Sequence, residues 1–253
     1  MVSNILILES KDILKKYKSK EAGNIAIERY ISFLPIKASS ELAGIIADLT
    51  GDGHIQGEPK WRFDYSSNSE DELQRFNSAI KNMFGISGKI RKCTTNKYDT
   101  KNLGVNNKIV AIILEGTGAP IGNKVHKKFR IPSWIINNKI FFARYMNRLF
   151  SCEGNVDIKG KTLEIKMYKS TELIQDGIAY FKEIQSALHT HFNIKTISPY
   201  LEGKIYKRAN GKSTQGIRLK IKNKESVVHF YNCIGIDDKQ KREKLESIIQ
   251  TIK

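Results

Sequence analysis

The sequence has few cysteines and no long apolar segment. Its 253 residues include three cysteines, Cys93, Cys152 and Cys233, and no CxxC pair. This argues against a zinc knuckle or a disulfide framework and indicates a reducing compartment. No apolar run reaches the roughly 20 residues that span a bilayer, and residues 1–11 lack the charged-then-apolar order of a signal peptide. We therefore expect a soluble intracellular protein without a membrane partner, cytoplasmic in a prokaryote or organellar in a eukaryote.

Acidic residues are scarce relative to basic ones. Lys and Arg number 43 against 26 Asp and Glu, which gives a net charge of +17. Such a surplus raises association rates with polyanions and supplies the counterion-release contribution to DNA affinity. With 40% hydrophobic residues, the chain has a globular composition and the length for one large domain or two compact halves. Charge alone favours a nucleic-acid partner over a ribosomal or anionic-membrane partner.

The sequence contains an approximate internal duplication. The first copy is predicted to contain a helix, a hairpin, a second helix and two further strands, at residues 40–51, 60–65, 73–85, 89–93 and 108–114. The second copy repeats this order and adds a short helix, at residues 137–152, 163–168, 171–192, 196–207, 216–222 and 226–234. Both opening helices lead into an acidic residue and a glycine, Asp52-Gly53 and Glu153-Gly154. We therefore predict an α+β fold of two αββαββα repeats related by pseudo-twofold symmetry.

The duplication divides the chain into three predicted segments. Residues 37–136 form the first repeat and residues 137–253 the second, which ends in a predicted helix over residues 239–252. Residues 1–36 lie outside the repeats, and their polar, Lys-rich character indicates an N-terminal helical extension.

The acidic residues at the ends of the two opening helices indicate catalytic chemistry. A helix carboxyl end carries partial negative charge, which disfavours Asp52 and Glu153 there by about 0.3 kcal/mol or more. A divalent cation removes this repulsion, because carboxylates and terminal carbonyls are oxygen ligands that suit Mg²⁺. The small residues Ala43, Ala47 and Gly51 line one face of the first helix, so a second helix can approach closely. Paired carboxylates that share metal ions hydrolyse phosphodiesters; the alternative is that each pair is an ordinary turn.

One predicted strand combines an apolar face with a basic face. Ile217, Leu219 and Ile221 point to one side of it, and the intervening residues are basic. Such a strand suits a DNA groove, although a solvated charged face is the alternative. The basic residues predicted to contact DNA are Lys60, Arg62, Lys166, Arg218, Lys220 and Lys222.

Two segments resemble the motifs of a known family. Residues 42–55, which end in Gly51-Asp-Gly-His-Ile55, resemble the first LAGLIDADG motif of homing endonucleases in its archaeal form. Residues 145–156 resemble the second motif. Residues 130–135 are similar to the segment that joins the two halves in that family. The resemblance covers about residues 37–253.

The resemblance implies a fold and an activity. The homing endonuclease fold places curved antiparallel sheets in the major groove as a DNA-binding saddle, with the two motif helices at the pseudo-twofold axis. By this resemblance Asp52 and Glu153 bind Mg²⁺, with the carbonyls of Gly51 and Cys152 as further ligands. Mn²⁺ or Ca²⁺ can replace Mg²⁺ in binding. A monomer with two motifs cuts both strands of double-stranded DNA at a long asymmetric site and leaves short 3′ overhangs.

The resemblance also implies supporting residues and leaves alternatives open. A basic residue near the end of each repeat supports the active site in the family, and Lys128 and Lys239 are the corresponding residues here. Arg148 departs from the pattern, because the family prefers Gly or Ala at this position. An intron-encoded enzyme is expected, since the chain starts at Met1 without splicing blocks. The alternatives are a maturase that binds intron RNA and a catalytically degenerate DNA-binding regulator.

Overall fold

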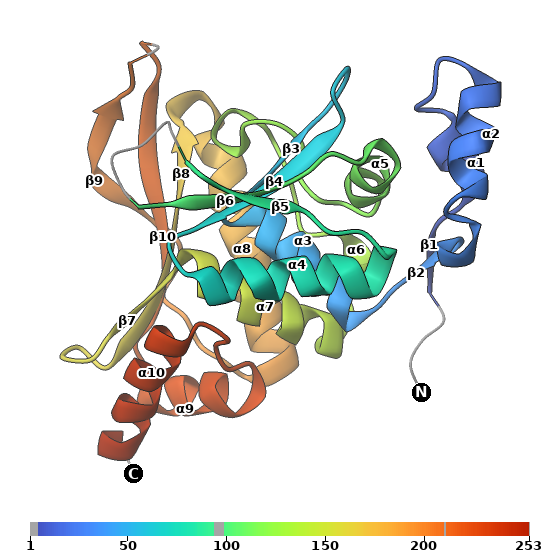
Figure 1. Cartoon of the computed structure of the whole chain (residues 1–253). Helices are drawn as coiled ribbons and strands as arrows, with labels where there is room; N and C mark the ends of the chain where they lie inside the picture. Colours follow the sequence, from blue (N-terminus) through green and yellow to red (C-terminus); the bar gives the residue numbers. More distant parts are fainter. Residues whose placement is uncertain (1–4, 94–98, 210, 253) are drawn as a thin grey trace. The chain divides into compact units, whose positions relative to one another are not determined.

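The computed structural model describes residues 5–93, 99–209 and 211–252, so residues 1–4 of the predicted extension and Lys253 lie outside it. The chain divides into two compact units, Met1–Gly122 and Asn123–Lys253 (Figure 1). Among the described helices, none is both long and apolar enough to cross a membrane.

The start of the first unit is a small helical segment. Its elements are β1 (Leu6–Leu8), α1 (Ser10–Leu14), α2 (Lys20–Glu28), a 3-10 turn η1 (Ile31–Phe33) and β2 (Ile36–Lys37), with β1 and β2 antiparallel. The segment packs against the rest of the unit, where Lys16 Nζ lies 2.9 Å from Glu115 Oε1. A Cβ on Gly116 would lie 2.8 Å from Leu8 Cδ1, so the glycine admits the Leu8 side chain. Residues 5–36 therefore belong to the compact first unit.

The remainder of the first unit is an αββαββα arrangement. Its elements are α3 (Ser40–Thr50), β3 (Gly53–Gln56), β4 (Arg62–Ser67), α4 (Glu70–Phe84), β5 (Lys89–Lys92), β6 (Lys101–Val105) and α5 (Lys108–Gly116). Ser39 caps α3, because its hydroxyl accepts a hydrogen bond of 3.1 Å from Leu42 N. The four strands form an antiparallel sheet in the order β3-β4-β6-β5.

The second unit repeats this arrangement and extends it. Its elements are η2 (Lys124–His126), α6 (Ser133–Ile136), α7 (Lys139–Glu153), β7 (Gly154–Asp157), β8 (Thr162–Ser170), η3 (Thr171–Leu173), α8 (Ile174–Phe192), β9 (Tyr200–Lys207), β10 (Ser213–Ile221), α9 (Lys224–Cys233) and α10 (Lys239–Ile252). Its sheet has the order β7-β8-β10-β9. The strand order is therefore the same in both units, which confirms the predicted α+β fold with duplicated αββαββα connectivity.

The pairing register of the two sheets also matches. Gly53 lies opposite Tyr65 in the first sheet, and Gly154 lies opposite Ile165 in the second. In both units the glycine that follows the acidic residue therefore opens the edge strand of the sheet.

Each sheet has one buried face. In β10 the apolar residues Ile217, Leu219 and Ile221 are buried and alternate with partly exposed basic residues, as predicted from the period of two. The predicted apolar face of α4 is likewise buried, with Phe76 and Ile80 fully enclosed. This alternation leaves the other face of each sheet for polar side chains.

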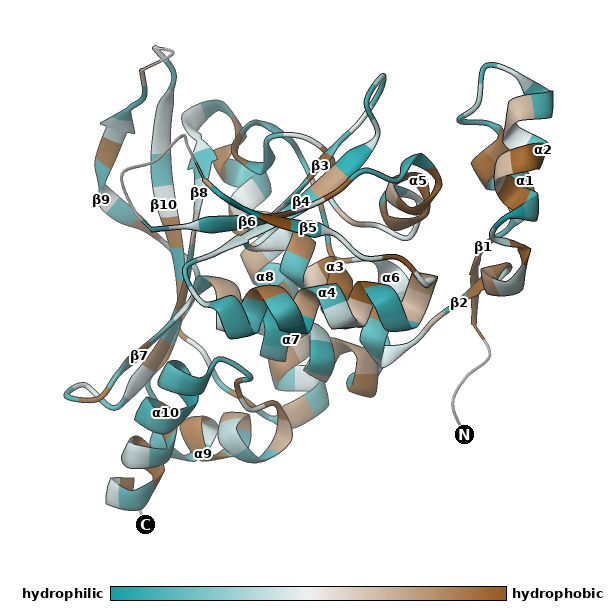
Figure 2. Cartoon of the chain, in the orientation of Figure 1, coloured by the Kyte–Doolittle hydropathy of each residue, from teal (hydrophilic) through white to brown (hydrophobic). Residues whose placement is uncertain are grey.

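The strand predicted at residues 108–114 is wrong, because this segment is helix α5. The Asn107 side chain caps the helix by accepting a hydrogen bond of 3.1 Å from Val110 N. Residues 109–114 are all buried, and α5 is hydrophobic around most of its circumference in Figure 2. A short run of this kind has no polar face to reveal its period, so a buried helix and a buried strand look alike in sequence. The missing strand is β6.

The boundary between the compact units precedes the predicted boundary between repeats. Residues 123–136 belong to the second unit. Lys169 Nζ donates a hydrogen bond of 2.9 Å to the Lys124 carbonyl, and Arg130 Nη1 lies 2.6 Å from Asp176 Oδ1. These contacts attach the segment to β8 and α8. The boundary between the two sequence repeats, between residues 136 and 137, stays a prediction, because the compact units are defined by contacts and not by the duplication.

Candidate functional site

Asp52 lies at the carboxyl end of helix α3. The helix is buried from Leu42 to Thr50, whereas Asp52 is exposed. A Cβ on the next residue, Gly53, would lie 2.8 Å from Leu49 Cα and 3.1 Å from Asp64 O. Only a glycine allows the chain to pass this close to the helix. The chain thus turns from helix into sheet within two residues, and this turn determines where Asp52 lies.

Glu153 has the corresponding position in the second unit. It is the last residue of α7, whose residues Tyr145 to Ser151 are buried. A Cβ on Gly154 would lie 2.3 Å from Phe150 Cδ1 and 2.4 Å from Phe150 O. The backbone of Gly154 has a φ of −83°, which any residue can adopt, so the glycine is required for space and not for its φ. Both units therefore have an acidic residue between a buried helix and a closely packed glycine.

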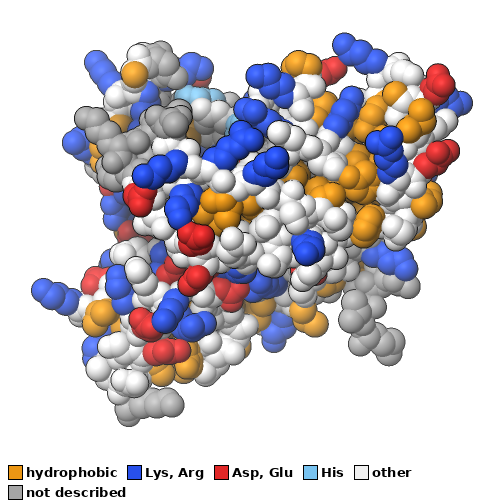
Figure 3. All heavy atoms as spheres, viewed as in Figure 1, with side chains coloured by type: hydrophobic (Ala, Val, Ile, Leu, Met, Phe, Trp, Pro, Cys, Tyr) orange, Lys and Arg blue, Asp and Glu red, His pale blue; other side chains and the backbone are white. Residues whose placement is uncertain are grey.

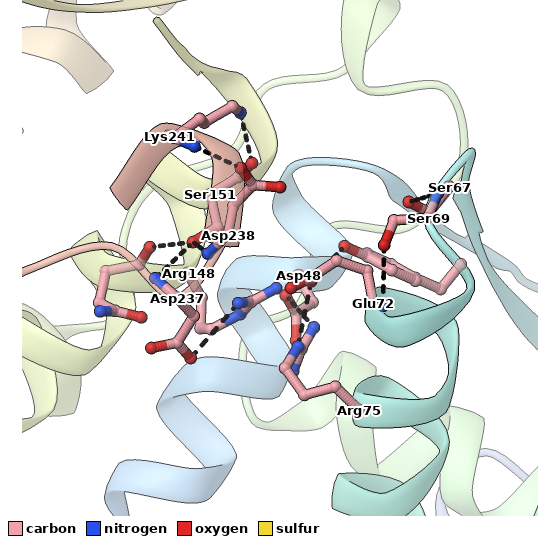
Figure 4. A network of polar contacts seen from close by, with 12 residues as sticks. Asp48, Ser67, Ser69, Glu72, Arg75, Arg148, Ser151, Asp237, Asp238 and Lys241 are labelled. Carbon is pink, nitrogen blue, oxygen red and sulfur yellow. Dashed lines mark hydrogen bonds and ion pairs between the residues drawn. The ribbon is translucent and has the colours of Figure 1, made fainter. Parts of the chain in front are cut away.

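A network of polar contacts holds the last turns of α7 (Figure 4). Ser151 Oγ donates to the Asn147 carbonyl at 2.9 Å and accepts from the backbone N–H groups of Asp237 and Asp238, each at 3.2 Å. Lys241 Nζ donates to the carbonyls of Ser151 and Cys152, at 2.5 and 3.2 Å. An ammonium group at a helix carboxyl end satisfies carbonyls that have no helical partner and offsets the dipole.

Arg148 is part of this network. Its side chain is fully buried, with an exposed fraction of 0%, and its Nη1 lies 3.3 Å from Asp237 Oδ2. Arg144 Nη1 lies 2.6 Å from the same oxygen. Burial raises the pKa of Asp237, but Arg144 and then Arg148 outweigh it and hold the pKa below its ordinary value. Helix α7 is continuous from Lys139 to Glu153 with Arg148 inside it.

A buried ion pair also lies on α3. Asp48 is completely buried, and its Oδ1 lies 2.9 Å from Arg75 Nη2 on α4. Arg75 Nε in turn lies 3.1 Å from Glu72 Oε2. The sequence signal for this pair is Asp48 within the apolar run from Leu42 to Leu49, and it was not among the predicted features.

The two predicted supporting lysines have different surroundings from Lys241. Lys239 is the exposed first residue of α10, and Lys128 is exposed in the segment that precedes α6. The lysine that contacts the end of α7 is Lys241, two residues after the predicted one. Both lysines can be read from the sequence. Which of their side chains points toward the end of α7 depends on the residue at which α10 begins.

The outer face of the first sheet carries basic side chains. Arg62 on β4 is exposed, as are Lys89, Arg91 and Lys92 on β5, and they line a common groove. Lys89 lies opposite Gly104 and Arg91 opposite Asn102, so their cross-strand neighbours are uncharged. Within the described parts of the chain, neither Lys89 nor Arg91 has an ion-pair partner. Figure 3 shows Lys and Arg side chains gathered over β5 and β6.

The basic residues of β5 were not among the predicted DNA contacts, although Lys89-Ile-Arg-Lys92 is a short basic strand. Of the predicted contacts in this unit, Arg62 lies on this face. Lys60 is exposed in the turn that precedes β4.

The outer face of the second sheet combines basic and acidic side chains. Arg218 Nη1 lies 2.8 Å from Glu164 Oε1, and Arg218 Nη2 lies 2.5 Å from Glu202 Oε1. Lys166 Nζ lies 3.6 Å from the same Glu202 oxygen. Lys220 lies 4.0 Å from Glu164. The basic side of β10 is thus as predicted, but the neighbouring strands β8 and β9 supply carboxylates that neutralise it; Lys222 is exposed beyond the end of β10.

Oxygen donors that would suit the implied divalent metal lie at both helix ends. No cluster of three or more His, Cys, Asp or Glu occurs in the described ranges, so a metal there needs backbone carbonyls or water besides carboxylates. Asp52 and the Gly51 carbonyl are oxygen donors of the kind that Mg²⁺ prefers. The Cys152 carbonyl beside Glu153 already accepts a hydrogen bond from Lys241, and the ammonium charge opposes a second cation nearby.

No family model matches the chain. It is 28% identical over 220 residues to glutamine–fructose-6-phosphate aminotransferase of Methanocaldococcus jannaschii, covering 87% of this chain and 18% of that protein. It is 24% identical over 249 residues to the tRNA-splicing ligase RtcB of Pyrococcus abyssi, covering 90% of this chain and 26% of that protein. The chain thus spans about a quarter or less of these relatives.

Solved structures show the same fold. The homing endonuclease I-WcaI, bound to its DNA recognition sequence, aligns over 94% of this chain and 98% of its own, with 15% identity and a TM-score of 0.55. Full-length WhiA from Thermatoga maritima aligns over 90% of this chain and 66% of its own, with 15% identity and a TM-score of 0.50. The chain therefore has the homing endonuclease fold. WhiA, which is not named as an endonuclease, also has this fold.

Proposed function

We propose that this chain is a site-specific endonuclease of double-stranded DNA. The observation that carries the proposal is the matched pair of acidic residues, Asp52 and Glu153. Each lies at the carboxyl end of a buried helix, next to a glycine that tolerates no side chain. The carboxyl end of a helix carries partial negative charge, and a divalent cation bound by the two carboxylates would offset it.

The proposed metal ligands are Asp52 and Glu153, with the Gly51 carbonyl and, more weakly, the Cys152 carbonyl. A bound Mg²⁺ would supply a polarised phosphate and an activated water, and Mn²⁺ or Ca²⁺ would compete for the same oxygen donors. Lys241 is the proposed positioning residue, in place of Lys239, because its ammonium holds the last carbonyls of the helix that carries Glu153. Lys128 stays a proposal for the first repeat.

The outer faces of the two sheets are the proposed DNA-binding surfaces. The basic residues of β5 extend the predicted set of Lys60, Arg62, Lys166, Arg218, Lys220 and Lys222. A net charge of +17 supplies the non-specific part of the affinity. I-WcaI, which has the same fold, is bound to its DNA recognition sequence. This supports double-stranded DNA as the partner of a monomer with two repeats.

The sequence relatives support a self-contained module. By their names, an aminotransferase and a tRNA-splicing ligase perform unrelated chemistry, and the shared segment makes up only 18% and 26% of them. We infer that the matched segment is separate from the parts that perform the named activities. Homing of the encoding DNA, with short 3′ overhangs as products, is the activity that we propose for the segment.

A catalytically degenerate DNA-binding protein is the second candidate. The observation that favours it is the Lys241 ammonium at the Cys152 carbonyl, which weakens the metal site at Glu153. Cleavage of one strand only is the intermediate case between the two candidates.

The test is cleavage of a randomised duplex library in Mg²⁺, with both strands resolved. We compare the wild type with Asp52→Asn and Glu153→Gln, and use the exposed Glu172→Gln as the matched control. Double-strand cuts at one long site, absent in both acid variants and retained in the control, support the proposal. If only one strand is nicked and only Asp52→Asn abolishes the nick, the catalytic site of the second repeat is degenerate. Tight binding without any scission refutes the nuclease and favours the second candidate.

A further inference from the structure

The outer faces of the two sheets differ in how their charges are arranged. We call the first the basic face, comprising Arg62, Lys89, Arg91 and Lys92. We call the second the paired face, comprising Lys166, Arg218, Lys220, Glu164 and Glu202. On the basic face the side chains of Lys89 and Arg91 extend from an edge strand with no acidic partner in the described ranges. On the paired face each cation lies within 4.0 Å of a carboxylate.

Two nitrogens of the Arg218 guanidinium donate hydrogen bonds to carboxylates. Its Nη1 donates to Glu164 Oε1 at 2.8 Å and its Nη2 to Glu202 Oε1 at 2.5 Å. The exposed fractions of the two carboxylate side chains are 11% and 16%. The plane of the guanidinium is therefore set before any ligand binds.

The two carboxylates are themselves held in place. Tyr200 Oη donates a hydrogen bond of 2.9 Å to Glu164 Oε2, so both oxygens of Glu164 are engaged. Glu202 lies over Gly216, where a Cβ would come within 2.6 Å of Glu202 Oε2. The glycine in β10 thus makes room for the carboxylate. This preorganisation reduces the side-chain entropy that binding would otherwise cost.

Such an arrangement is poorly suited to a phosphate. A phosphate at Arg218 would lie beside two carboxylates and be repelled by them. A cation that is already neutralised also releases few counterions from DNA. Lys89 and Arg91 on the basic face have neither drawback within the described ranges, whereas Lys92 Nζ lies 3.6 Å from Asp99 Oδ1. Phosphate contacts therefore belong to Lys89 and Arg91 first.

The same arrangement suits the edge of one base pair. In the major groove guanine presents two acceptors, O6 and N7, and cytosine presents an amino donor. Arginine has five N–H donors, of which the carboxylates of Glu164 and Glu202 engage two. The remaining donors match the O6 and N7 acceptors of guanine, while the two glutamates hold the guanidinium in place. Glu164, Arg218 and Lys220 also line one surface groove, which gives a base edge access to them.

We propose that Arg218, oriented by Glu164 and Glu202, determines specificity for one guanine–cytosine base pair, whereas the basic face contacts phosphates. The inference rests on the proposed function, because it requires double-stranded DNA as the ligand. Arg218 contacts the base in this scheme, and the two glutamates are positioning residues.

The test is selection from a randomised duplex library in Ca²⁺ buffer, followed by binding titrations over a range of salt concentrations. Arg218→Lys keeps the charge but loses the fork of donors, and Glu202→Gln keeps the shape but loses the charge. We expect the wild type to select a G·C pair at one position, and both variants to lose that preference by about 10-fold or more. The slope of affinity against salt should stay unchanged in Arg218→Lys, because the charge is retained.

Lys89→Gln is the matched control on the basic face. It should weaken binding alike for all sequences and reduce the salt slope by about one. Thermal unfolding of each variant excludes loss of fold as the cause. If folded Arg218→Lys and Glu202→Gln keep the base preference of the wild type, the inference is overturned, but the proposed binding to DNA is not. No duplex binding by the wild type refutes the proposed function itself.

Discussion

Replacing Gly154 with alanine adds only one methyl group, but it should destabilise the second unit strongly. The added Cβ would lie 2.3 Å from Phe150 Cδ1 and 2.4 Å from Phe150 O, whereas ordinary contact begins at 3.4 Å. The groups must therefore separate by about 1 Å. Phe150 is 1% exposed, and its ring lies 5.1 Å from that of Phe230, so it has no space to move into.

The expected loss follows from these contacts. Overpacking of a filled core costs about 1–3 kcal/mol, and disturbing the last hydrogen bond of α7 adds about 1 kcal/mol. We expect Gly154→Ala to lower the free energy of unfolding by about 2–4 kcal/mol. Because the φ of −83° suits alanine, no backbone strain contributes to this loss.

The assay is urea unfolding followed by tryptophan fluorescence. Trp61 lies in the first unit and Trp134 in the second, so a Trp61→Phe background makes Trp134 the reporter. Gly203→Ala in β9 is the matched control, since its Cβ would meet nothing within 4 Å. The control should be neutral or stabilising by a few tenths of a kcal/mol, about 0.5 at most. If Gly154→Ala also stays within about 0.5 kcal/mol of the background, the tight junction between α7 and β7 is refuted.

Two further predictions concern the polar network at the end of α7. Asp237→Asn should lower the free energy of unfolding at pH 7 by about 1–2 kcal/mol, a value reduced for the partial exposure of the side chain. Because the pKa of Asp237 is lowered in the folded state, its contribution is fully present above the unfolded pKa and is lost as the pH falls through the folded pKa; urea midpoints of wild type and variant that fail to converge on acidification would contradict this. Lys241→Gln should cost about 1 kcal/mol and Lys239→Gln less than about 0.5 kcal/mol in the same urea assay, and equal losses would contradict the assigned contact.

The features that were predictable from sequence depend on neighbouring residues. The duplicated order, the buried helix α3 and the acid-glycine pairs at Asp52 and Glu153 all follow from local periodicity and end signals. Helix α5 was misread because a run without polar residues has no visible period. Even there, the connectivity of the repeat came out correctly, since β6 takes the place of the strand assigned to residues 108–114.

The features that were not predictable depend on residues far apart in the chain. Arg218 and its partners Glu164 and Glu202 lie on three strands, and their pairing follows from a register that no single strand reveals. Lys241 contacts the end of α7 about 90 residues earlier in the chain. A basic strand can be recognised in sequence, but whether its charges are neutralised is decided by cross-strand neighbours.

The matched register of the two sheets has a consequence for how this molecule changes over evolutionary time. The inward row of each sheet consists of apolar residues, such as Ile55 and Val156, which are interchangeable in kind. At equivalent rungs of the outward rows, Asn102 lies opposite Ser66 and Arg218 opposite Lys166, and these pairs differ in charge. Since an outward side chain does not enter the core, the polar row of either sheet can change by single substitutions while the buried row that holds the unit together stays the same.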